Sequence, residues 1–156
     1  MKRQISLFLL LFLLPVLLFG CSRKDTDLKA VLSDINTAYP ENTGDFRELT
    51  DASELEVYYS ISPDDVRQFA AQIKKNSTNA PAEIVLVEAV DAAAAERIKT
   101  ELDHRYHSIV SMYASYSPEE LEMAKQCGVT SSGNFVTMIV SENYDGMMNI
   151  VNTAIG

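Results

Sequence analysis

The segment "ELDHRYH" contains the residues of this chain whose types and spacing come nearest to a metal site. Glu101, His104 and His107 follow one another at intervals of three residues, and imidazole and carboxylate groups one helical turn apart can bind a divalent cation. On a helix that turns about 100° per residue, however, both histidines fall well away from the apolar stripe that contains Ile98. We therefore interpret this segment as a solvated polar face, and we expect no metal and no other cofactor.

The other nucleophiles and acids form no catalytic pattern. Cys127 follows a predicted helix, where a small buried side chain is the favoured interpretation, because a reactive thiolate needs an electropositive pocket and a base. Ser131 and Ser132 lie in "SSGN", which lacks the glycine-flanked nucleophile of hydrolases. The acidic pairs begin predicted helices, where negative charge complements the helix dipole; they are Asp64–Asp65 and Glu119–Glu120. We expect no enzyme active site.

The residues before Cys21 predict a different role for this cysteine, as a site of lipid attachment. Lys2 and Arg3 give a cationic start, and residues 7–19 are an uncharged apolar run of 13 residues, shorter than the roughly 20 residues that cross a bilayer. This pattern is typical of a secretory signal. The sequence "LFGC" at 18–21 resembles a bacterial lipobox, in which the cysteine thiol is acylated and the chain is cut just before it.

This resemblance gives an expected location and division of the chain. Residues 1–20 are interpreted as a lipoprotein signal peptide, 21–26 as a lipid-anchored tether and 27–156 as one extracytoplasmic domain, held at the cell membrane through the lipid on Cys21. An uncut signal anchor, with Cys21 as a bystander, is the alternative.

Composition limits what such a domain can do. Residues 21–156 hold 11 basic and 22 acidic residues, a net charge of −11, so nucleic acid is excluded as a partner because no basic stripe is present. The 136 residues suffice for one domain with a modest core. Cys127 is the one cysteine besides Cys21, so the domain must be stable without an internal disulfide.

Periodicity predicts alternating helices and strands. Apolar spacing predicts helices at 28–39, 62–76, 92–116 and 145–155, with a shorter helix from Ser117. Alternation predicts a half-buried strand at 54–62, and the uninterrupted apolar run at 83–90 predicts a central strand with both faces covered. A strand at 135–141 follows a turn, with 127–130 as a possible hairpin partner. Residues 40–53 are expected to be a polar loop anchored by Phe46 and Leu49.

These elements predict an α+β fold, with a small three- or four-stranded sheet packed with helices in two layers. Tyrosines 59, 106, 113 and 116 are expected in the core. Tyr58 falls on the polar side of its predicted strand, and tyrosine is common at interfaces.

The order of these segments resembles a known family. After the lipobox and first helix come "YYSISPDDV", "EIVLVEAVDAAAAERIKTEL", "YSPEE", "GNFVTMIVS" and a closing helix. Over about residues 28–154 this order is similar to small Gram-positive lipoproteins known as domain of unknown function 4358. The resemblance implies a membrane-anchored extracytoplasmic domain and supplies no catalytic residues.

Two functions therefore remain open. The favoured hypothesis is a non-enzymatic binding or interaction module whose partner is another envelope protein or a cell-wall component. The alternative is a small metal-dependent envelope hydrolase that uses His104 and His107.

Overall fold

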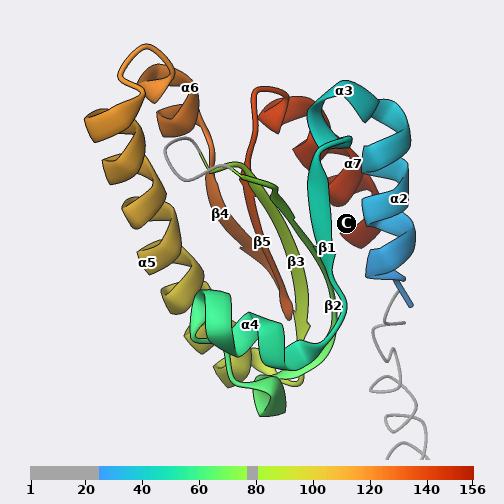
Figure 1. Cartoon of the computed structure of the whole chain (residues 1–156). Coiled ribbons are helices and arrows are strands. Elements are labelled where there is room, and N and C mark those ends of the chain that lie inside the picture. The colour runs from blue at the N-terminus through green and yellow to red at the C-terminus, as the bar shows by residue number, and fades with distance from the viewer. Residues whose placement is uncertain (1–24, 77–80) are drawn as a thin grey trace, which may run out of the picture.

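Five strands form one antiparallel sheet in the computed structural model, which describes residues 25–76 and 81–156. Their order is β1-β2-β3-β5-β4 (Figure 1). The strands are β1 (Phe46–Leu49), β2 (Val66–Lys74), β3 (Glu83–Ala89), β4 (Gly128–Ser132) and β5 (Phe135–Val140). The α+β class is thus confirmed, with five strands where three or four were predicted. The signal peptide and Cys21 lie outside the described residues.

Helices cover both faces of this sheet (Figure 1). One face carries α2 (Leu28–Ala38) and α7 (Tyr144–Ile155), and the other carries α4 (Ala52–Tyr59), α5 (Ala92–Tyr116) and α6 (Leu121–Gln126). The short helix α3 (Pro40–Thr43) and the single 3₁₀ turn η1 (Pro63–Asp65) connect elements. The prediction of two layers was therefore wrong, because the sheet has an apolar core on each side. No helix in the described part of the chain is long and apolar enough to cross a membrane.

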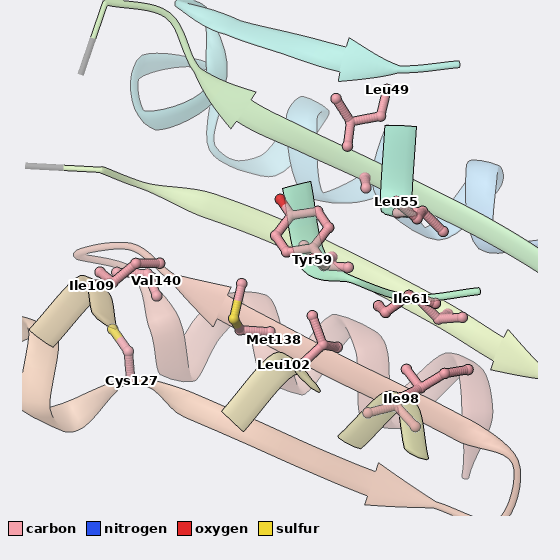
Figure 2. Close-up of a cluster of buried hydrophobic side chains, with 14 of the residues drawn as sticks. Leu49, Leu55, Tyr59, Ile61, Ile98, Leu102, Ile109, Cys127, Met138 and Val140 are labelled. Atoms are coloured by element: carbon pink, nitrogen blue, oxygen red, sulfur yellow. The ribbon is translucent and has the colours of Figure 1, made fainter. Parts of the chain in front are cut away.

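The central position predicted for the apolar run is confirmed in β3. All seven of its side chains are buried. Val85 and Val87 point into the core beneath α5, while Ile84 and Leu86 point toward α2 and α7. Figure 2 shows the first of these cores, where α5 and β5 side chains meet. A strand buried on both faces needs apolar residues at every position, which explains the absence of alternation.

The strand predicted at 54–62 is instead helix α4. Leu55 and Tyr59 are buried, and since they are four residues apart they suit a helix as well as a strand. Val57, which alternation would bury, is 79% exposed. Asp51 and Glu54 form a capping box around the first turn, and this local signal favours the helix.

The helix predicted at 62–76 is instead η1 followed by β2. Ser62 caps as expected, since its Oγ accepts a hydrogen bond from the Asp64 amide, but the helical turn ends at Asp65. β2 then pairs with β1 on one side and β3 on the other. These two ladders outweigh the local helical signal. Phe46 and Leu49 are buried as predicted, although they belong to strand β1 rather than to a loop.

The second half of the chain follows the predictions more closely. β4 and β5 form the expected hairpin, and Gly133 adopts the positive φ of 57° that its turn requires. Tyr113 is buried on α5 as predicted, but Tyr106 is half-buried and Tyr116, predicted inward, is 66% exposed. Ser117 ends α5 instead of capping the next helix, and α6 begins at Leu121.

The doubly covered strand gives a stability prediction. Val85→Asp or Leu86→Asp places a charge without a partner in one of the two cores, which costs several kcal/mol, a large part of the total stability of about 5–15 kcal/mol expected for a domain. We expect either variant to lose cooperative unfolding in thermal and urea melts followed by circular dichroism. Val57→Asp is the matched control and should melt like the parent, because its side chain is exposed on α4. Parent-like melting of both core variants would contradict the central position of β3.

Candidate functional site

A polar cavity of about 460 Å³ lies at the end of the sheet where β1 and β3 begin. The antiparallel register brings these strand ends together, because Phe46 pairs with Lys74 and Glu83 pairs with Val140. The lining includes the apolar residues Phe46 and Met123. Four carboxylates from three parts of the chain line the cavity; they are Glu41 and Asp45, Glu120, and Glu142.

The cavity has an excess of negative charge. Its four carboxylates face one lining cation, Lys74, and none of the four makes an ion pair with another described residue. The pKa of the Tyr113 hydroxyl, which lines the cavity, is affected by this charge. Burial, together with the charges of Glu120 and Glu142, raises this pKa to about 12. Such an environment favours a positively charged group.

The geometry does not favour a metal ion in this cavity. Across residues 25–76 and 81–156, no three His, Cys, Asp or Glu side chains are grouped closely enough to hold one. Carboxylates spread over a 460 Å³ space suit instead a larger group that carries its charge on a hydrogen-bonding head.

A second charged cluster is buried between β3 and α5. The Arg105 guanidinium binds the Glu83 carboxylate, with Nε 3.2 Å from both oxygens. The nearby Tyr59 hydroxyl is buried, and burial, followed by the charge of Glu83 and a hydrogen bond with it, raises the pKa of Tyr59 well above its usual range. Because Glu83 and Tyr59 are both buried, the cluster serves the core and is not accessible to a substrate.

The histidines are exposed on α5, as predicted. The His104 side chain is 72% exposed and its Nδ1 lies 3.6 Å from Glu101. His107 Nδ1 lies 2.7 Å from the Asp103 carbonyl oxygen. Glu101 lines another cavity, of about 560 Å³, beside α4 and η1, but neither histidine lines this cavity or the acidic one.

The remaining candidates occupy structural positions. Cys127 is buried as predicted, and burial raises the pKa of its thiol, so the unreactive protonated form is favoured. Asp65 binds Arg97 at 2.5 and 2.9 Å, which lowers the pKa of the carboxyl group. Tyr58 is exposed on α4 and accepts a hydrogen bond of 3.0 Å from Arg47.

Sequence reasoning missed the acidic cavity entirely. Glu41 lies in α3, Asp45 before β1, Glu120 before α6 and Glu142 after β5. No spacing in the sequence links these positions. The overall acidity of the chain was the one available signal.

The exposed histidines give a metal-binding prediction. Without a third ligand and a second layer of hydrogen-bonded side chains, zinc affinity should be poor. We expect residues 22–156, purified without a histidine tag, to contain no stoichiometric metal, and the double variant His104→Ala/His107→Ala to keep the parental Tm. Isothermal titration with zinc is the measurement. Submicromolar one-to-one binding that the double variant abolishes would contradict this prediction and support the hydrolase.

Comparison with known proteins gives one match. Residues 40–141 match the family model described as "Domain of unknown function (DUF4358)". The matched segment contains all five strands of the sheet together with α4, α5 and α6. No curated protein and no solved structure matches the chain. Because the match covers well over half of the 156 residues, the chain belongs to the DUF4358 family of domains of unknown function.

Proposed function

We propose that this protein is a membrane-anchored extracytoplasmic lipoprotein whose domain is a non-enzymatic binding module. The lipobox-like "LFGC" and the apolar run before it support the anchor. The structure is consistent with a short tether, because Thr26, five residues after Cys21, is already buried. The resemblance to Gram-positive lipoproteins supports the same location.

The observation that supports a binding role is the acidic cavity. Its carboxylates lack cationic partners among the described residues, while its lining includes the apolar residues Phe46 and Met123. A lysine or arginine side chain combines an apolar stem with a cationic head, so it can use both features. We therefore propose a basic segment of another envelope protein as the partner.

The metal-dependent hydrolase is the weaker proposal. An enzyme that used His104 and His107 would need a pocket in which a substrate meets the metal. The two histidines lie on the exposed side of α5 and line neither cavity described above.

The anchor is tested by replacing the acylated residue. We expect the wild-type protein to fractionate with membranes and to carry a diacylglycerol thioether on an N-terminal Cys21. Cys21→Ser should leave the protein unlipidated, because serine supplies no thiol. Membrane fractionation and mass spectrometry of the extracted protein are the measurements. A free Cys21 thiol in the mature, membrane-extracted protein would refute the anchor.

The binding site is tested by charge reversal. Crosslinking in intact cells, followed by recovery through the native anchor, should capture a partner with the wild type. The double variant Glu41→Lys/Glu142→Lys should lower this recovery about tenfold or more, because it places like charges opposite a basic partner. Recovery is measured by quantitative mass spectrometry against a matched control.

The control variant is Asp34→Lys/Glu56→Lys, which makes the same change in net charge at exposed positions of α2 and α4 outside the cavity. It should capture the partner like the wild type. Equal capture by both double variants would exclude the cavity as the binding surface. If the cavity variant instead lost capture of a cell-wall fragment, and no captured protein depended on the cavity, the partner would be a wall component and the proposed protein partner would be contradicted.

A further inference from the structure

The first described residues are fixed to one end of the sheet. The Gln68 side chain on β2 donates a hydrogen bond of 2.7 Å to the Thr26 carbonyl and accepts one of 3.1 Å from the Leu28 amide. The Thr26 hydroxyl donates to the Ala154 carbonyl at the end of α7, at 3.0 Å. The chain therefore has a defined position in the domain from Thr26 onward.

This attachment point is itself bonded to the neighbouring strand. Gln68 Nε2 also donates to Glu88 at 2.7 Å, and Gln68 is paired with Glu88 across β2 and β3. The Glu88 side chain is only 5% exposed, and it lies 3.6 Å from Arg67. A partly buried, mutually bonded group of this kind resists rearrangement.

The acidic cavity lies at the opposite end of the same strands. Gln68 is near the start of β2, and Lys74 at its end lines the cavity. Six residues of extended chain separate them, a distance of roughly 20 Å at about 3.3 Å per residue. Figure 1 shows α3 and α6 at one end of the sheet and the start of α2 toward the other.

The length of the preceding segment limits how the domain can stand on a membrane. Thr26 is five residues after Cys21, so the two Cα atoms are at most about 18 Å apart. If the cavity end faced the bilayer, Thr26 would lie about the length of the sheet above it, roughly 20 Å, which is at the limit of what the fully extended segment can span. The inverted arrangement is therefore disfavoured for a protein anchored at Cys21, because it would need the segment at full extension.

The negative charge of the domain opposes a broad contact with an anionic membrane. The net charge of residues 21–156 is −11, and anionic headgroups repel acidic surfaces that come within a Debye length, about 8 Å at physiological salt. The end of the sheet near the attachment point also carries exposed carboxylates, of Asp64 and Asp91, beside Val90, which is 38% exposed. An upright domain brings only this small end near the headgroups.

We propose that the domain stands on the bilayer with the Val90 end of β3 toward phospholipid headgroups and the acidic cavity facing outward. This inference rests on the proposed lipid anchor. It assigns the bilayer as the partner of the surface around Val90, the η1 turn and the β4–β5 turn, which share this end of the sheet. It also implies that the binding partner approaches from the side away from the membrane.

Energy transfer from two reporter sites tests this orientation. Ala93→Cys places a thiol on the exposed start of α5, at the Val90 end, and Glu119→Cys places one beside Glu120 at the cavity. Each full-length variant is expressed in cells, extracted in its lipidated form, labelled with a donor fluorophore and reconstituted in anionic vesicles with acceptor-labelled headgroups. We expect clearly more transfer from position 93 than from position 119.

Three controls separate the possible outcomes. The parent protein measures background labelling of the buried Cys127, and each reporter combined with Cys21→Ser should show no transfer. An insertion of about twelve Gly and Ser residues after Lys24 should reduce the difference, because it lengthens the reach by roughly 20 Å. Equal transfer from both sites in a protein shown by mass spectrometry to be lipidated would overturn the orientation alone. Absence of lipid on Cys21 would overturn the anchor and the orientation together.

Discussion

The fold depends on one constraint, that β3 must be covered on both faces. All seven of its side chains are buried, and they alternate between the core beneath α5 and the core beneath α2 and α7. Neither layer of helices is sufficient alone, since a sheet with one apolar face exposed would be unstable in water. The Glu83 carboxylate at the start of β3 adds a second requirement, because a buried charge is tolerated only when it is paired, here with Arg105.

Covering both faces determines where function can be located. Once helices occupy the two faces, the edges and the two ends of the sheet remain open to solvent. The antiparallel register brings Phe46, Lys74 and Val140 to one end and Val66, Ala89 and Phe135 to the other. The acidic cavity is found at the first end, and the first described residues are attached at the second. The proposed division between a membrane-facing end and a binding end therefore follows from the layering.

Sequence periodicity predicted the elements in which many residues along the chain are buried in one regular pattern. The run at β3 and the stripe of α5 could be predicted because each has several buried residues with one period. Residues 54–76 could not, because Leu55 and Tyr59 suit both periods and the capping signal at Ser62 continues for only one turn. The exposure of His104 followed from helical geometry alone. The acidic cavity is formed by residues that only the strand pairing brings together, so no local pattern could reveal it.

The hydrogen bond between Thr26 and Ala154 joins the first and last described segments, and this has a mechanical consequence. A pull on the chain before Thr26 would load the Thr26 bonds to Gln68 and to Ala154 at the same time. Bonds loaded together share the force, whereas bonds loaded in sequence break one after another. Tension on this segment would thus be shared between β2 and α7.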